Sequence, residues 1–153
     1  MAGFKFKLQP VLEMREREER EKKLALADLE RERMWIENRI RGYQQNIETE
    51  QSSLAQMLGT QGGVDLRGAR LQANAAVSNR FSAQRAVLEL AGVHHQIERA
   101  RTELAEASAR RKAVELLRDR QQEAFELEQR RRESIEMDDM SVMRYSRGQG
   151  TLR

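Results

Sequence analysis

Apolar residues recur at coiled-coil spacing along the first third of the chain, and we call this stripe the seam. One heptad position holds Leu12, Leu26, Ile40, Ile47 and Leu54, and the position three residues further on holds Leu8, Leu29, Ile36, Tyr43 and Met57. Polar residues interrupt the seam at Arg15, Glu19, Lys22, Arg33 and Glu50 without changing its period. A stripe this narrow must be buried against another helix, because alone it leaves its apolar side in water.

Helix signals place the boundaries of the first helix and of the later segments. Pro10 suits the first turn of a helix, so we expect a helix over residues 10–58. The glycine-rich stretch 59–64 is the strongest turn signal in the interior of the chain. Asp65 can cap a short helix over residues 65–71, with Gly68 as a second interruption. A long helix is then expected over residues 72–140, with a local bend at Gly92.

The second long helix carries a looser seam. Leu90, Ile97, Leu104 and Phe125 share one heptad position, which Arg111 and Arg118 interrupt. Val93, Ala100, Ala107 and Val114 lie three residues further on. Alanine at several of these positions allows two helices to approach closely. The sequence therefore predicts an all-α fold, an elongated antiparallel two-helix coiled-coil hairpin forming one domain over residues 1–145, followed by a flexible tail over residues 146–153.

Composition agrees with a thin helical rod rather than a globular core. Of the 153 residues, 35% are charged and only 5% are aromatic. The 28 basic and 25 acidic residues leave a net charge of +3 and are interleaved, as in the pairs Glu13/Arg17 and Glu18/Lys22 at i,i+4 spacing. Such interleaving is typical of a solvated helix face.

Several classes of function find no support in the sequence. Cysteine is absent, which removes disulfides, thiolate metal sites and a cysteine nucleophile. No phosphate-binding loop or nucleophile elbow is present. His94 and His95 point about 100° apart on a helix and supply too few ligands for a metal. We therefore expect no enzyme activity, no catalytic residue, no metal and no cofactor.

The location that the sequence suggests is the cytoplasm. No run of about 18 apolar residues is present, as a membrane-spanning helix requires, and residues 1–12 lack the apolar core of a signal peptide. Trp35 flanks the seam and is expected to pack there rather than to anchor a partner.

The second helix is longer than the first, so the region beyond about Glu115 must run past the start of helix one. It carries the basic clusters 110–112 and 130–132 and then the acidic residues Glu133, Glu136, Asp138 and Asp139. Such an end can insert into a ring or dock on a charged partner, although a solvated coiled-coil end has the same composition. Nucleic-acid binding is a further alternative, weakened by acids such as Glu115 and Asp119 between the clusters.

Both ends of the chain resemble those of the flagellar export protein FliJ family. The resemblance rests on Phe4-Lys-Phe-Lys-Leu-Gln-Pro-Val-Leu12 at the start, and on residues 111–120, Phe125, Glu128 and residues 131–139 near the other end. It implies a coiled coil similar to the central stalk of rotary ATPases, acting in the type III export apparatus at the flagellar base, and so in motility. The implied location is cytoplasmic, at the inner face of the cell membrane, where protein partners would hold the chain.

The resemblance also implies partners and contact residues. The partners are the hexameric flagellar export ATPase, whose assembly and activity such proteins promote, the cytoplasmic domain of the export gate, and export chaperones. The paired ends, roughly residues 8–29 and 114–137, would meet the ATPase, with candidates Leu117, Arg118, Arg120, Phe125, Glu128 and Arg131. The gate would bind Leu71, Val77 and Phe81. A generic coiled-coil adaptor or a virulence-type secretion stalk remains an alternative with the same geometry.

Overall fold

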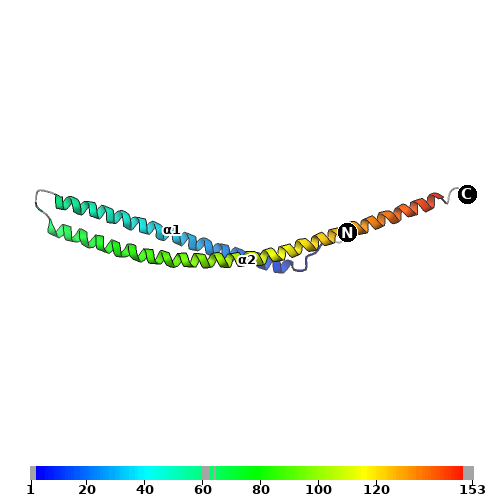
Figure 1. The fold of residues 1–153 in the computed structure, drawn as a ribbon, viewed down its shortest axis with the longest axis horizontal. Helices are drawn as coiled ribbons and strands as arrows, with labels where there is room; N and C mark the ends of the chain where they lie inside the picture. Colours follow the sequence, from blue (N-terminus) through cyan, green and yellow to red (C-terminus); the bar gives the residue numbers. More distant parts are fainter. Residues whose placement is uncertain (1–2, 60–62, 64, 150–153) are drawn as a thin grey trace. The chain divides into compact units, whose positions relative to one another are not determined.

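In the computed structural model of the protein, the described residues form two helices (Figure 1). The structure describes residues 3–59, 63 and 65–149, which contain α1 (Gln9–Gly59) and α2 (Leu66–Gln149) and no strand. The predicted all-α fold class is therefore confirmed. The packing divides the chain into two compact units, residues 20–105 and residues 1–19 with 106–153, which we call the hairpin unit and the terminal unit.

Both helices begin at the signals that the sequence provides. Pro10 is the second residue of α1, and the amide of Leu12 donates to the carbonyl of Leu8 at 3.0 Å. Before α2, Oδ1 of Asp65 accepts hydrogen bonds from the amides of Arg67 and Gly68, each at 3.1 Å. The predicted role of Asp65 as an N-cap is confirmed, because its side chain satisfies two amides of the first turn.

The stretch after Asp65 differs from the expectation of a short separate helix. Residues 66–71 are the first turns of α2, which continues through Gly68 and Gly92 and past residue 140 to Gln149. Gly68 lies beside the cap, where a Cβ atom would be only 2.5 Å from Oδ2 of Asp65. That glycine accommodates the capping carboxylate rather than ending a helix. Gly63, with a φ of 102°, adopts the left-handed conformation that glycine favours.

Two predicted segments fall partly outside the described residues. Of the turn over 59–64, residues 60–62 and 64 are outside the description, and of the tail over 146–153, residues 150–153 are outside it. Residues 146–149 belong to α2.

The hairpin unit is an antiparallel helix pair with its core on the predicted seam. Ile36, Ala86, Val93 and Ile97 are buried, and Leu26, Leu29, Ile40, Tyr43 and Leu90 pack against them. Contacts between the helices join residues whose numbers rise along α1 as they fall along α2, such as Lys22 with Glu103, Arg39 with Glu89 and Glu50 with Asn79. The two segments lie side by side in Figure 1. The seam positions deduced for Ile36, Val93 and Ile97 are thereby confirmed.

The side of α2 that faces α1 changes in character along the hairpin unit. From Leu90 to Leu104 it carries large apolar residues, whereas over residues 72–86 its half-buried and buried members are small or polar, such as Ala76, Asn79 and Ala83. The larger apolar side chains of that stretch are exposed instead, with Phe81 68% and Leu71 65% exposed. At the start of α2 the large apolar side chains therefore point away from α1.

The terminal unit pairs the start of α1 with a middle part of α2. Leu12 and Ala107 are both 1% exposed and form its buried apolar positions, and Glu19 is buried beside them. Beyond this pairing α2 continues to Gln149, and nearly all its described side chains from residue 130 to 145 are exposed. α2 therefore extends past the start of α1 within this unit.

Candidate partner-binding surfaces

A buried polar layer interrupts the seam of the terminal unit. Oε1 of Glu19 accepts a hydrogen bond from the hydroxyl of Ser108 at 2.9 Å, and Oε2 accepts one from Nε of Arg111 at 2.5 Å. Arg111 also binds Glu115 one turn further on, at 2.5 Å. The hydrogen bond to Glu19 is the largest cause of a raised pKa for the Arg111 guanidinium. The two seam interruptions that the sequence revealed are thus partners, which holds the register of the helices at this level.

The ring of Phe125, predicted as an ATPase contact, packs within the terminal unit. Its centroid lies 5.8 Å from that of Phe4, with an angle of 48° between the ring planes. Both residues are half-buried. The segment before α1 is therefore held on α2 by an aromatic pair, and Phe125 has a structural role before any role in binding.

The remaining predicted ATPase contacts lie along one stretch of α2. Leu117, Arg120, Glu128 and Arg131 fall within roughly 80° of one another around the helix axis, and all four are exposed. Glu128 binds Arg132 at 3.1 Å, while Arg118 lies nearer the seam, half-buried, and binds Asp119 at 2.9 Å. The structure thus aligns four of the six candidates on one outer side and leaves Arg118 and Phe125 off it.

The predicted gate contacts Leu71, Val77 and Phe81 are all exposed in the hairpin unit, and the last two lie at a groove. The groove has a volume of about 850 Å³, and Val77 and Phe81 line it together with Arg39 and Tyr43 of α1 and Arg85 and Leu88 of α2. Two helices contribute its walls, so the hairpin unit forms it without other parts of the chain.

Arg39 and Trp35 form a pair at the edge of this groove. The guanidinium carbon of Arg39 lies 4.5 Å from the centroid of the Trp35 ring, and its Nη1 donates to Glu89 of α2 at 2.9 Å. Hydrogen bonds to Tyr43 and to Glu89 raise the pKa of Arg39. Trp35 is 60% exposed, so the expectation that it packs beside the seam is wrong, and its ring instead supports Arg39.

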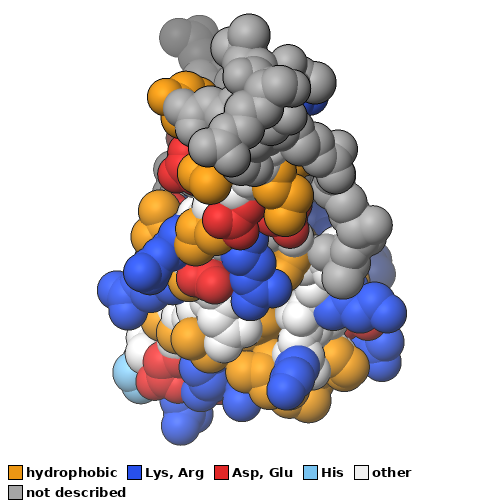
Figure 2. Space-filling view, turned by 90° about the vertical axis from the view of Figure 1, so that its right-hand side faces the viewer, with side chains coloured by type: hydrophobic (Ala, Val, Ile, Leu, Met, Phe, Trp, Pro, Cys, Tyr) orange, Lys and Arg blue, Asp and Glu red, His pale blue; other side chains and the backbone are white. Residues whose placement is uncertain are grey.

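Charged and apolar side chains are interleaved on the face of the molecule shown in Figure 2. Within the part that the structure describes, no group of three or more acidic or histidine side chains is placed to hold a metal ion. None of the described helical segments is both long and apolar enough to cross a membrane.

Comparison with protein families gives one match, to the family described as Flagellar FliJ protein, over residues 4–150. The chain belongs to the FliJ family. Comparison with curated proteins and with solved structures gave no match. Membership makes the chain a component of the flagellar export apparatus, and the FliJ family is non-enzymatic within it.

Sequence reasoning missed parts of both surfaces of this FliJ family member. Leu88, Arg85 and Tyr43 line the groove beside Phe81, yet the pattern singles out only Tyr43, as a seam residue. The signal for Leu88 was its spacing of seven residues from Phe81, which places it on the same side of α2. The pairing of Glu19 with Arg111 could have been found from the two seams, since each residue occupies a seam position in its own helix.

Proposed function

We propose that this chain acts as a stalk for the flagellar export ATPase, binding the hexameric ring and promoting its assembly and ATP hydrolysis. The observation that carries the proposal is the extension of α2 past the start of α1 in the terminal unit. A single helix of this kind normally needs a partner, because helices in water depend largely on packing for stability. A ring that surrounds the exposed stretch supplies that packing.

The chemistry of the stretch suits contact with several similar surfaces. Arg120 and Arg131 are exposed and have no ion-pair partner within the described residues, and Leu117 and Leu127 add exposed apolar area to the same stretch. Modest apolar contacts with interspersed charges favour repeated, adjustable association over one deep anchor. Binding the assembled ring but not its free subunits would stabilise the hexamer by mass action.

We infer further that the outside of the hairpin unit binds the cytoplasmic domain of the export gate, through Leu71, Val77 and Phe81. The exposure of all three residues and the adjoining groove support this role. The same chain would then connect the ATPase and the gate, and would also meet export chaperones. Its location would be cytoplasmic, peripheral at the inner face of the membrane at the flagellar base, through these proteins.

The test is ATP hydrolysis by the cognate export ATPase at limiting concentration, with and without this chain. We expect stimulation together with a shift toward hexamer, and we expect Leu117→Ala combined with Arg120→Glu to weaken both several-fold. Phe81→Ala in the hairpin unit is the matched control and should leave stimulation unchanged. Absence of stimulation by the unaltered chain would overturn the stalk role and leave that of a coiled-coil adaptor.

Phe125→Ala needs a control of its own, because the ring also packs on Phe4. Phe4→Ala removes the same ring contact without altering α2. Equal losses of ATPase stimulation in the two variants would show that the effect depends on the packing of the segment before α1 on α2. A loss confined to Phe125→Ala would assign it to the surface of α2.

A further inference from the structure

The first turns of α2 carry basic residues without acidic ones. Between Asp65 and Glu89 the sequence contains Arg67, Arg70, Arg80 and Arg85 and no Asp or Glu. The rest of the chain interleaves the two signs, with 28 basic and 25 acidic residues in the whole sequence. This segment therefore departs from the charge pattern of the rest of the protein.

Apolar and basic side chains share the outer side of this segment. Arg70, Val77, Phe81 and Leu88 are separated by seven, four and seven residues, which places them along one side of the helix. Phe81 is 68% and Leu88 74% exposed. The opposite side meets α1 through small residues such as Ala83 and Ala86, so α1 leaves these large side chains largely uncovered.

Two grooves flank this outer side. The groove of about 850 Å³ contains Phe81, Arg85 and Leu88, and a second of about 480 Å³ is lined by Val87, Leu88 and Ala83 together with Ile40 of α1. Leu88 and Gln84 line both grooves. A side chain of a partner can therefore enter a groove on either side of Leu88. The surface is grooved as well as apolar.

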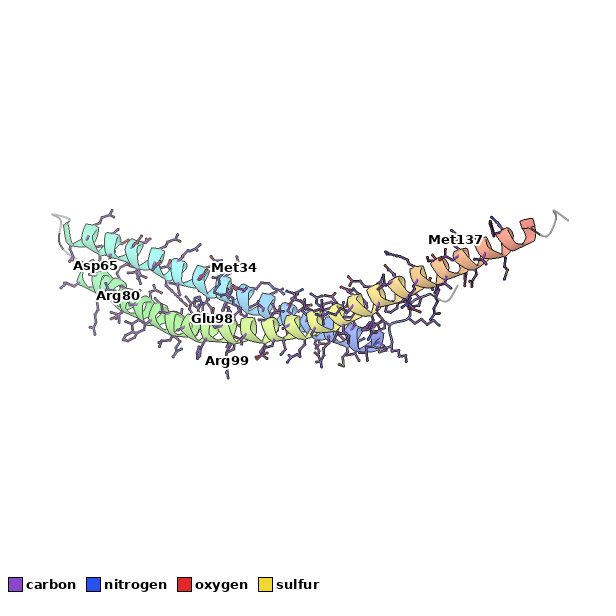
Figure 3. The ribbon with its side chains drawn as sticks, turned by 45° about the vertical axis from the view of Figure 1, so that its right-hand side comes forward. Met34, Asp65, Arg80, Glu98, Arg99 and Met137 are labelled. Carbon is purple, nitrogen blue, oxygen red and sulfur yellow. The ribbon has the colours of Figure 1, made fainter. Side chains whose placement is uncertain are left out.

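The arginines of the segment remain uncompensated. No ion pair to Arg67, Arg70, Arg80 or Arg85 is present among residues 3–59, 63 and 65–149. Arg39, on the α1 side of the groove, is by contrast bound to Glu89 and stacked on Trp35. Figure 3 marks Arg80 on this segment, and further along α2 it marks Arg99, which points away from α1. Arg99 lies between Glu98 and Glu103, where both signs occur.

We propose that the segment of the export gate received by this face is acidic as well as apolar, with carboxylates beside Arg70 and Arg85 and apolar side chains beside Phe81 and Leu88. The inference rests on the gate role proposed above and adds the chemistry of the partner. Complementary charge steers association and selects among partners that share apolar anchors. The grooves favour a protein segment over a lipid bilayer, because a bilayer surface has no side chains to place in them.

The test measures binding of the purified cytoplasmic region of the export gate to the full chain. Affinity is determined over a series of salt concentrations for the unaltered chain and for three variants. Arg70→Glu with Arg85→Glu reverses two charges of the face, Phe81→Ala removes an apolar anchor, and Arg99→Glu is the matched charge control on the same helix. Helix content of each variant is checked by circular dichroism.

We expect the affinity of the unaltered chain to fall with rising salt. The double reversal should weaken binding about tenfold at low salt and flatten the salt dependence. Phe81→Ala should weaken binding and leave the salt dependence in place, and Arg99→Glu should bind like the unaltered chain.

The outcomes separate this inference from the gate role itself. Loss of binding in Phe81→Ala with none in the double reversal, or binding that does not vary with salt, would overturn the acidic partner and keep the gate role. No gate binding by the unaltered chain would overturn both. Vesicles of phosphatidylglycerol and phosphatidylethanolamine are tested in parallel. Vesicle binding lost on the double reversal, with gate binding unaffected by it, would assign the face to lipid instead.

Discussion

Glu19 and Arg111 meet across the two helices of the terminal unit, with Oε2 and Nε 2.5 Å apart. The side chain of Glu19 is only 8% exposed, and Ser108 binds its second oxygen. Burial of this carboxylate is tolerated because both of its oxygens accept hydrogen bonds from α2. The layer therefore selects one alignment of α1 against α2, since shifting either helix separates the three groups.

Replacing Glu19 should lower the melting temperature, because the polar layer then loses its central group. We expect Glu19→Ala to lower it by several degrees, because Ser108 and Arg111 lose their shared acceptor. Glu21→Ala, on an exposed position nearby, should change it little. Glu19→Leu combined with Arg111→Leu should recover the loss, because apolar residues suit a seam position. A double variant less stable than Glu19→Ala alone would contradict this reasoning.

The apolar core of the hairpin unit should dominate its stability. Ile36 and Ile97 are 2% and 1% exposed, so Ile36→Ala or Ile97→Ala should each reduce the free energy of unfolding by about 2–5 kcal/mol. Denaturant unfolding followed by helix content measures the loss. Leu88→Ala, at a 74% exposed position, is the control and should stay within about 0.5 kcal/mol of the unaltered chain.

Asp65 and Gly68 should be energetically coupled. Asp65→Ala removes the cap and should cost about 1 kcal/mol of unfolding free energy. Gly68→Ala alone should bring little benefit, since the new Cβ would crowd Oδ2 of Asp65 at 2.5 Å and displace the cap. In the Asp65→Ala background the same change should stabilise by up to about 1 kcal/mol, because alanine favours helix over glycine. Additive effects in the double-mutant cycle would show that the two positions act independently.

Acidification should weaken the bond between Lys22 and Glu103. The Lys22 ammonium, 2.6 Å away, holds the pKa of Glu103 below its ordinary value of 4.5. A carboxyl group with a lowered pKa in the folded state stabilises the fold above pH 4.5, and this stabilisation is lost as the pH falls through the folded-state pKa. The pair is partly exposed, so the effect is small and salt reduces it further.

Melting temperatures of the unaltered chain and of Glu103→Gln measure this loss across the acidic range. The difference between the two should be largest above pH 4.5 and should shrink on acidification. Glu21→Gln, at an exposed position, is the control. A difference that stays constant over the whole range would exclude a contribution from this ionisation.

The heptad pattern and the glycine-rich break were sufficient to predict two helices, their antiparallel pairing and most buried positions, but not the register between the helices. Ile36, Val93 and Ile97 are buried where the period places them, because a narrow apolar stripe is removed from water by packing against a second helix. Gly68 misled the boundary prediction, since a glycine inside a helix and a glycine that ends one look alike until the position of Asp65 is known. Trp35 misled because its ring contacts Arg39, one turn further along the same helix, and not the seam.

The candidate surfaces could be predicted only in part. Periodicity identifies which residues lie outside the seam, and so it found Val77 and Phe81. It does not show that Tyr43 and Arg39 of α1 join them in one groove, since that depends on how closely the helices approach. The ring contact of Phe125 with Phe4 likewise joins residues with no shared pattern.

The small residues of α2 that face α1 imply a gradient of amide hydrogen exchange along the hairpin unit. No described side chain over residues 41–59 or 65–85 is fully buried, whereas Ile36, Ala86, Val93 and Ile97 are. Local opening is governed by the apolar contacts that it breaks, so amides of residues 54–59 and 70–76 should exchange faster than those near Ile97. The part of the chain that carries the grooves would then be the part that separates most readily, and a bound partner would slow its exchange.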